Sequence, residues 1–160
     1  MKPLDTKRCT LSKICEKDID EAVRVYTDEK ARAFLGGVIP RAAAEEKLHA
    51  YVRENREVFC VRLKDQGQFL GLIYVTPYHE DGCYELSYVF LPEFWNQGYA
   101  FETVKEILQY CKTELHFAEL VSETQTRNLA SRKLLEKLGY RFQKEVVRFE
   151  EQQSVYQIRL

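Results

Sequence analysis

The segment FWNQGYA, residues 94–100, has the residue types and spacing of a site that binds an anion through backbone groups. It precedes a stretch, 98–113, whose apolar residues recur at helical spacing. A helix N-terminus leaves N–H groups unpaired and carries about half a positive charge, so it attracts phosphate. Gly98 and Ala100 are small and two residues apart, which would let a phosphate approach the backbone. The amides that would then converge on the anion belong to Gln97, Gly98, Ala100 and Phe101.

Two common nucleotide-binding patterns are absent from this segment. It has neither the GxxxxGK[ST] spacing and lysine of a P-loop nor the GxGxxG spacing of a dinucleotide fold. A pyrophosphate held by backbone groups alone fits the segment better. The alternative is a tight strand-to-helix turn that binds nothing.

Periodicity predicts the elements that would position this segment. Apolar and β-branched runs bounded by polar, Gly or Pro residues predict strands, and apolar residues at helical spacing predict helices. The expected strands cover 8–14, 58–63, 69–75, 83–91, 118–122, 140–149 and 154–160, and the expected helices cover 18–26, 41–55, 98–113 and 128–138. This order, with a strand–loop–helix unit in the middle, is typical of a mixed α/β (α+β) domain.

Length and composition favour a single domain over residues 1–160. The chain has 24 basic and 25 acidic residues, and this balance gives no reason to expect a nucleic-acid partner. No apolar run approaches the roughly 18 residues that a membrane span needs, and the N-terminus has no apolar signal region. We therefore expect no membrane partner.

The five cysteines are widely spaced and form no CxxC pair. They are Cys9, Cys15, Cys60, Cys83 and Cys111. An odd number without a ligand spacing favours neither a disulfide framework nor a metal site, so we expect no metal and a cytoplasmic location. Most of these residues are expected to be small core hydrophobes.

Two segments together resemble the GNAT superfamily of acetyl-CoA-dependent N-acetyltransferases, and within it the branch that includes the ribosomal-protein N-acetyltransferases. YVFLPEFWNQGYAFE contains the superfamily's Q/R-x-x-G-x-G/A loop, with Gly98 and Ala100 at the small positions and Trp95 in place of Gln or Arg. ETQTRNLASRKLLEKLGYRF matches N-x-x-S-x-x-x-L-x-K-x-G-[FY]. The matching residues are Asn128, Ser131, Leu135, Lys137, Gly139 and Tyr140.

The resemblance implies a GNAT-like fold with acetyl-CoA as co-substrate. Its central mixed, mostly antiparallel sheet would have about six to seven strands, with a splayed parallel pair, and about four flanking helices. Pantetheine would pair with the backbone of Val89 and Phe90, whose side chains would still be core, and the loop amides would hold the pyrophosphate. Asn128 would bind the pantetheine arm near the thiol, although Asn is also a good helix N-cap.

The resemblance also implies catalytic candidates. An amine acceptor must lose a proton before it attacks, and Glu85 or Glu123 could take that proton. Glu85 lies in an apolar strand that would raise its pKa, and Glu123 ends a strand at a position where some family members carry the base. Ser131 would lie near the coenzyme sulfur. Leu135 occupies the position of the usual tyrosine acid, so a dedicated acid is in doubt.

The sequence therefore predicts transfer of acetyl from acetyl-CoA to a primary amine by direct attack in a ternary complex. The acceptor could be a protein N-terminus, a lysine or a small-molecule amine, and the chain could be a monomer or a homodimer. The alternative is a non-catalytic acyl-CoA-binding sensor on the same fold, which Leu135 keeps open.

Overall fold

The computed structural model describes residues 2–80 and 82–160, which divide into two compact units. The first unit comprises residues 1–74 and 88–106, and the second comprises residues 75–87 and 107–160. Two strands, β4 (Phe69–Pro77) and β5 (Tyr84–Phe90), contribute residues to both units. No helix among the described residues is long and apolar enough to cross a membrane.

The first unit combines an antiparallel part of the sheet with three helices. Strands β1 (Leu4–Asp5), β2 (Cys9–Lys13) and β3 (Glu57–Leu63) pair antiparallel in that order. Two short helices, α1 (Ile19–Ala22) and α2 (Arg24–Thr27), are followed by α3 (Arg41–Arg53), and the unit ends with the start of α4 (Tyr99–Thr113). Single 3₁₀ turns cover Glu16–Asp18 and Pro92–Phe94. The fully buried large side chains of this unit are Leu11, Leu48, Phe59, Phe69, Leu70, Leu72, Ile73 and Leu91.

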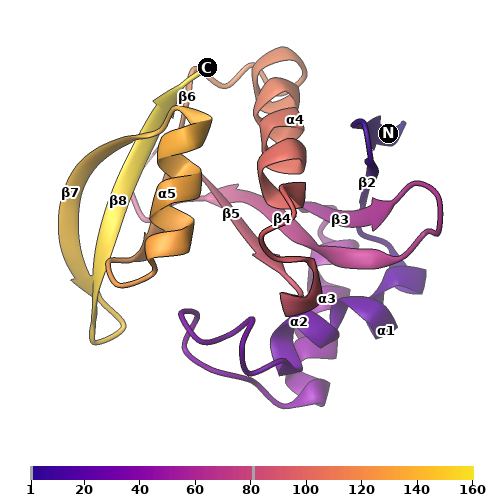
Figure 1. The fold of residues 1–160 in the computed structure, drawn as a ribbon. Helices are drawn as coiled ribbons and strands as arrows, with labels where there is room; N and C mark the ends of the chain where they lie inside the picture. The colour runs from indigo at the N-terminus through magenta and orange to yellow at the C-terminus, as the bar shows by residue number, and fades with distance from the viewer. Residues whose placement is uncertain (1, 81) are drawn as a thin grey trace. The chain divides into compact units, whose positions relative to one another are not determined.

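The second unit contains the parallel strand pair. Strand β5 pairs parallel with β6 (Glu119–Gln125), and the one register pair is Glu85 with Val121. Strand β8 (Glu151–Arg159) pairs antiparallel with both β6 and β7 (Arg141–Arg148). Helix α5 (Leu129–Leu138) lies beside the β7–β8 ribbon in Figure 1, and Arg132 Nε donates to the Tyr156 hydroxyl at 3.0 Å.

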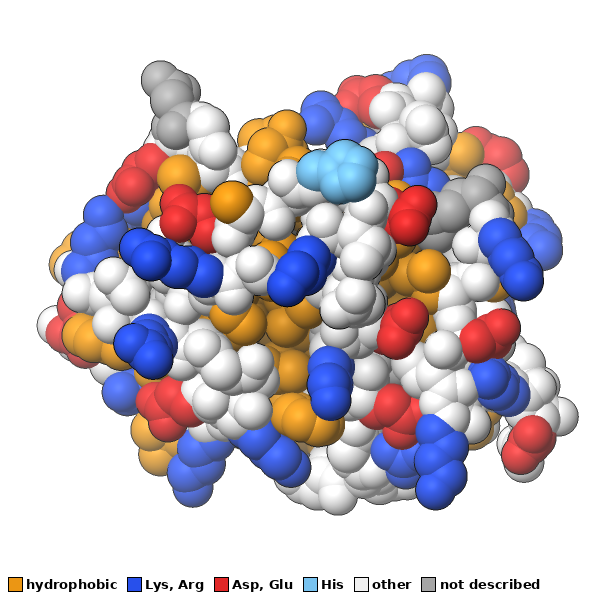
Figure 2. Space-filling model, turned by 90° about the horizontal axis from the view of Figure 1, so that it is seen from above, with side chains coloured by type: hydrophobic (Ala, Val, Ile, Leu, Met, Phe, Trp, Pro, Cys, Tyr) orange, Lys and Arg blue, Asp and Glu red, His pale blue; other side chains and the backbone are white. Residues whose placement is uncertain are grey.

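Hydrogen bonding gives the strand order β1-β2-β3-β4-β5-β6-β8-β7. This mixed α/β sheet confirms the predicted fold class, and its eight strands exceed the predicted six to seven because of β1. The expected helix over 18–26 is present as two short helices joined by a tight turn at Val23. Basic and acidic side chains are interspersed on the face that Figure 2 shows, in keeping with the balanced composition.

Gly71 in β4 allows a close backbone approach to β5. A Cβ atom at residue 71 would lie 2.2 Å from the Val89 carbonyl oxygen and 2.8 Å from the Phe90 Cα atom. Both are backbone atoms, so neither can move aside as the end of a side chain could. An isolated glycine within an apolar strand is a sequence signal for such an approach.

We expect Gly71→Ala to lower the free energy of unfolding by about 3 kcal/mol, because the added methyl group overpacks against backbone. Gly67→Ala is the matched control: its Cβ would meet nothing within 4 Å, although φ is +65°. That left-handed conformation alone costs about 1 kcal/mol. Urea unfolding measures both values, and equal losses would show that the approach at Gly71 is not the constraint.

Candidate active site

The loop between β5 and α4 has the backbone conformation of an anion-binding turn. Asn96 and Gly98 have positive φ angles of 58° and 81°. Residues 95–98, which lead into the helix, are exposed. Alternation of left-handed and right-handed residues turns successive N–H groups toward one side. The first bond into α4 runs from the Glu102 N–H to the Gly98 carbonyl at 3.1 Å, so the N–H groups of Tyr99 and Ala100 precede it. The helix begins at Tyr99, one residue later than expected, because Gly98 is left-handed.

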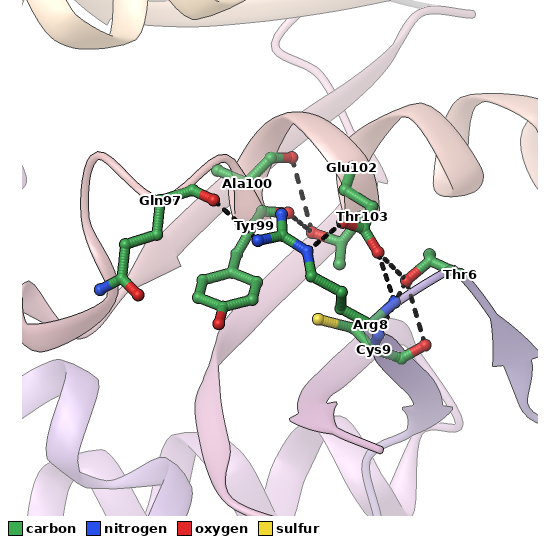
Figure 3. Close-up of polar contacts among 8 residues, drawn as sticks. All are labelled: Thr6, Arg8, Cys9, Gln97, Tyr99, Ala100, Glu102 and Thr103. Carbon is green, nitrogen blue, oxygen red and sulfur yellow. Dashed lines mark hydrogen bonds and ion pairs between the residues drawn. The ribbon is translucent and has the colours of Figure 1, made fainter. Parts of the chain in front are cut away.

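Arg8, at the entry to β2, anchors this loop (Figure 3). Its Nη1 donates to the Gln97 carbonyl at 3.0 Å, and its Nε donates to Glu102 at 2.7 Å. Its guanidinium also lies over the Tyr99 ring, 4.3 Å from the centroid. A Cβ at Gly98 would come within 3.3 Å of Arg8 Nη2, which gives a second reason for glycine there. These contacts join residues about 90 positions apart, so no local pattern could have revealed them.

Glu102 is held ionised in the first turn of α4. Its carboxylate accepts from the Thr6 hydroxyl at 2.6 Å and from the Arg8 backbone N–H at 2.7 Å. Burial opposes ionisation, but these bonds and the Arg8 guanidinium outweigh it and lower the pKa of Glu102. The paired arginine offsets the negative charge that Glu102 would otherwise present near an incoming phosphate.

The C-terminal end of β5 is fixed from two sides. The Leu91 N–H donates to the Leu70 carbonyl at 2.9 Å, next to the close approach at Gly71. On the other side, the Trp95 indole Nε1 donates to the Phe90 carbonyl at 2.8 Å. Trp95 therefore closes the strand end, and the Phe90 carbonyl already has a partner. Of the backbone groups predicted to meet pantetheine, that carbonyl is engaged within the chain.

In the second unit, both predicted carboxylates come together. The Glu123 N–H donates to Glu85 Oε1 at 3.4 Å. Glu123 Oε2 accepts from the Tyr78 hydroxyl at 2.6 Å and from Arg148 Nε at 3.1 Å, and its side chain is 8% exposed. Arg148 Nη2 also donates to Tyr78 at 3.2 Å. Glu123 is thus a paired carboxylate, and the sequence analysis identified neither Tyr78 nor Arg148.

Glu85 has the electrostatics of a proton acceptor. Burial raises its pKa to about 7, against the smaller lowering effect of the Glu123 N–H bond. The negative charge of Glu123 raises this pKa further, and the positive charge of Arg148 lowers it. A carboxyl that titrates near neutral pH can exchange a proton under ordinary conditions. The neighbouring Tyr78 hydroxyl, whose pKa burial raises to about 12, stays neutral.

The parallel pairing of β5 and β6 is minimal. Beyond the pair Glu85–Val121, the Ser122 hydroxyl donates to the Leu86 carbonyl at 2.6 Å. The Ser122 side chain thus binds the Leu86 carbonyl, which in a regular parallel ladder would accept from a backbone N–H. This is consistent with the predicted splay of the parallel pair.

The second sequence motif forms the start of α5. Asn128 is its N-cap, and its Oδ1 accepts from the Ser131 N–H at 3.2 Å. Only the Asn128 NH₂ group therefore remains to donate to a ligand. Ser131 is half-buried, and Leu135, with 1% exposure, is part of the core. The position of the usual tyrosine acid thus has neither the chemistry nor the exposure for proton transfer.

The structure distributes the predicted site residues over both units. The first unit holds the coenzyme candidates Val89, Phe90, Gln97, Gly98, Ala100 and Phe101. The second unit holds Glu85, Glu123, Asn128 and Ser131. Of these, Glu85 meets Glu123 and Asn128 meets Ser131. Their roles toward a ligand stay predictions.

The raised pKa of Glu85 has a consequence for stability. Folding favours the protonated carboxyl, so its stabilising contribution is complete below pH 4.5 and is lost as the pH rises to about 7. Glutamine mimics the protonated form, so we expect the gain in unfolding free energy from Glu85→Gln to grow by roughly 2 to 3 kcal/mol between pH 5 and pH 8. Urea unfolding at both pH values checks this. Glu114→Gln, at an exposed position, should show no such growth, and the same growth in both variants would contradict the assignment.

Comparison with known proteins identifies the family of the chain. An acetyltransferase (GNAT) domain family matches residues 8–141. An uncharacterized N-acetyltransferase, YnaD, of Bacillus subtilis (strain 168) is 27% identical over 139 residues, 86% of this chain and 82% of the relative.

Solved structures share the fold. A GNAT-family acetyltransferase from Bacillus anthracis superposes with a TM-score of 0.88 at 21% identity, covering 99% of this chain and 98% of that one. A spermidine N-acetyltransferase from Vibrio cholerae, in complex with CoA and spermine, gives 0.81 at 17% identity, over 94% and 95% of the chains. A putative ribosomal-protein-serine acetyltransferase from Vibrio cholerae gives 0.77 at 17% identity, over 99% and 98%. Because the family match covers residues 8–141, most of this chain, the chain belongs to the GNAT family of acetyltransferases.

Proposed function

We propose that the chain transfers acetyl from acetyl-CoA to a primary amine, with Glu85 as the general base. The observation that carries this proposal is the division between the two carboxylates: Glu123 is committed to Arg148 and Tyr78, whereas burial raises the pKa of Glu85 to about 7. A base with that pKa is largely ionised just above neutral pH and still basic enough to accept a proton.

The step is a direct attack in a ternary complex. Glu85 removes a proton from the ammonium group of the acceptor, directly or through one water. The freed nitrogen lone pair attacks the thioester carbonyl carbon, and the carbon–sulfur bond breaks to release a thiolate. The nitrogen then gives up its second proton, which ends on the thiolate or in solvent and leaves the amide and the coenzyme thiol. Thiol pKa values near 8 to 9 make the thiolate a tolerable leaving group, so the buried Leu135 is compatible with turnover. Ser131 is proposed to lie near that sulfur.

Two of the five cysteines, Cys9 and Cys60, are poor candidates for a covalent route. Burial raises the pKa of Cys9 to about 11 and raises that of Cys60 as well, and a thiol that resists ionisation is a poor nucleophile. The raised pKa values of these two thiols support direct transfer.

The family uses acetyl-CoA, and several residues of this chain fit that group. The left-handed Gly98, the N–H groups of Gln97, Gly98, Ala100 and Phe101 and the offset charge of Glu102 fit a pyrophosphate. The backbone of Val89, the Phe90 N–H and the Asn128 NH₂ group would hold the pantetheine arm. We propose that residues 1–160 act as one catalytic domain, in the cytoplasm, as a monomer or a homodimer.

The second candidate is a coenzyme-binding domain without catalysis, which the loss of the tyrosine acid at Leu135 favours. It predicts acetyl-CoA binding with no release of thiol in the presence of any amine. The two candidates therefore separate in a thiol-release assay run across amines.

Gly98→Trp should weaken acetyl-CoA binding at least tenfold in titration calorimetry, because the side chain would fill the phosphate position and crowd Arg8. Gly67→Trp is the matched control, since Gly67 also has a positive φ but faces open space. Circular dichroism verifies that both variants fold. Unchanged affinity in folded Gly98→Trp would remove the loop from the coenzyme site.

Glu85→Gln should lower kcat by about 10²- to 10³-fold and remove the rising limb of the kcat/KM–pH profile near pH 7. Glu123→Gln should keep that limb but move it to lower pH, because the negative charge that raises the pKa of Glu85 is gone. The opposite pattern, with the limb lost only in Glu123→Gln, would make Glu123 the base.

A further inference from the structure

Trp95 is an exposed aromatic residue that is held in place between the end of β5 and the loop that leads to α4. It is 43% exposed, and it is the only tryptophan of the chain. Its indole Nε1 donates to the Phe90 carbonyl at 2.8 Å, and its backbone N–H donates to the Pro92 carbonyl at 3.2 Å. Residues 88–106, which include Trp95, the end of β5 and the whole loop, belong to the first unit.

The exposed face of the Trp95 indole carries no stacked ring and no cation in the part of the chain that the structure describes. The neighbouring aromatic side chains, Phe94 and Tyr99, meet each other instead, with ring centroids 6.3 Å apart. A single exposed aromatic residue is ordinary on a protein surface. Trp95 differs from that ordinary case because its orientation is fixed beside groups that are expected to bind the coenzyme.

Tryptophan at this position of the loop motif combines two properties that Gln and Arg do not combine. All three side chains can donate an N–H bond to a carbonyl, but only the indole adds a rigid aromatic face that is largely apolar. The donor is used within the chain, on the Phe90 carbonyl. The apolar face remains available to a ligand, and its fixed position reduces the entropy that binding would cost.

Trp95 lies between the two expected contacts of the coenzyme. The diphosphate is proposed to bind the N–H groups of residues 97–101, which follow Trp95, and the pantetheine arm is proposed to meet Val89 and Phe90, which precede it. In CoA the segment that joins these two parts is pantoate, whose quaternary carbon carries two methyl groups. Burial of these methyl groups against an aromatic face is favourable, because it removes apolar surface from water on both sides.

We propose that the exposed face of Trp95 binds the dimethyl group of the pantoate segment of acetyl-CoA. The chain would then recognise the middle of its co-substrate as well as the diphosphate. This inference rests on the proposed binding of acetyl-CoA and gives Trp95 a role that the loop motif does not supply. The contact is apolar, so it involves no proton or charge, and the bond from Nε1 to the Phe90 carbonyl stays in place.

Fluorescence of the unaltered chain tests the contact, because all tryptophan emission comes from Trp95. Saturation with acetyl-CoA should shift the emission to shorter wavelength, since the indole passes from water to an apolar contact. The comparison ligand is an acetyl-CoA analogue in which hydrogen atoms replace both methyl groups of pantoate. At saturation it should give roughly half of this shift or less. Equal shifts, or no shift with bound acetyl-CoA, would overturn the inference.

A thermodynamic cycle measures the same contact in binding affinity. In titration calorimetry, wild type should bind acetyl-CoA about tenfold more tightly than the analogue, because two methyl groups leave water. Trp95→Gln keeps an N–H donor without the aromatic face, so this ratio should fall to about twofold or less. Phe149→Gln removes an exposed aromatic ring from the turn between β7 and β8 and is the matched control, which should keep the wild-type ratio. Equal ratios in wild type and Trp95→Gln would contradict the proposal.

This inference and the proposed function fail in different ways. Binding of acetyl-CoA to wild type with no preference over the analogue overturns this inference alone and leaves the proposed function intact. No binding of acetyl-CoA to folded wild type overturns the proposed function, and this inference with it. The fluorescence comparison uses no variant, so its outcome does not depend on whether Trp95→Gln folds.

Discussion

The feature on which the site depends is the short parallel ladder between β5 and β6. The strands share one register pair, Glu85 with Val121, after which the Ser122 hydroxyl takes the Leu86 carbonyl. A strand that leaves its neighbour this early keeps backbone groups that need partners from elsewhere, because unpaired buried amides and carbonyls are costly. In a coenzyme-binding protein, the ligand is the natural partner. The remaining neighbours of β5 must then hold it without that ladder.

The holding contacts come from distant parts of the chain. Gly71 of β4 lets the β5 backbone approach closely at Val89, and Trp95 closes the strand end through the Phe90 carbonyl. Arg8 then anchors the following loop and offsets the charge of Glu102. Strand end, loop and helix start are therefore fixed before any ligand arrives. Such preorganisation reduces the entropy that binding would otherwise cost.

Charge placement assigns different roles to groups that are chemically alike. Glu85 and Glu123 are both strand carboxylates, yet Glu123 is bound to an arginine and a tyrosine, whereas Glu85 is half-buried beside it. The negative charge of Glu123 keeps a proton on Glu85 up to a higher pH.

The sequence by itself determined what depends on neighbours along the chain. Strand and helix periodicity, the glycine and alanine before α4 and the Asn128 cap gave the element order, the mixed sheet and the family resemblance. The tertiary structure decided the contacts of Arg8, Tyr78, Arg148 and Gly71 and the division between the two carboxylates. Each of those features joins residues that are far apart in the sequence. Electrostatic interaction, burial and close packing depend on distances in the folded chain, so they follow from the tertiary structure. No local pattern records which distant groups will meet.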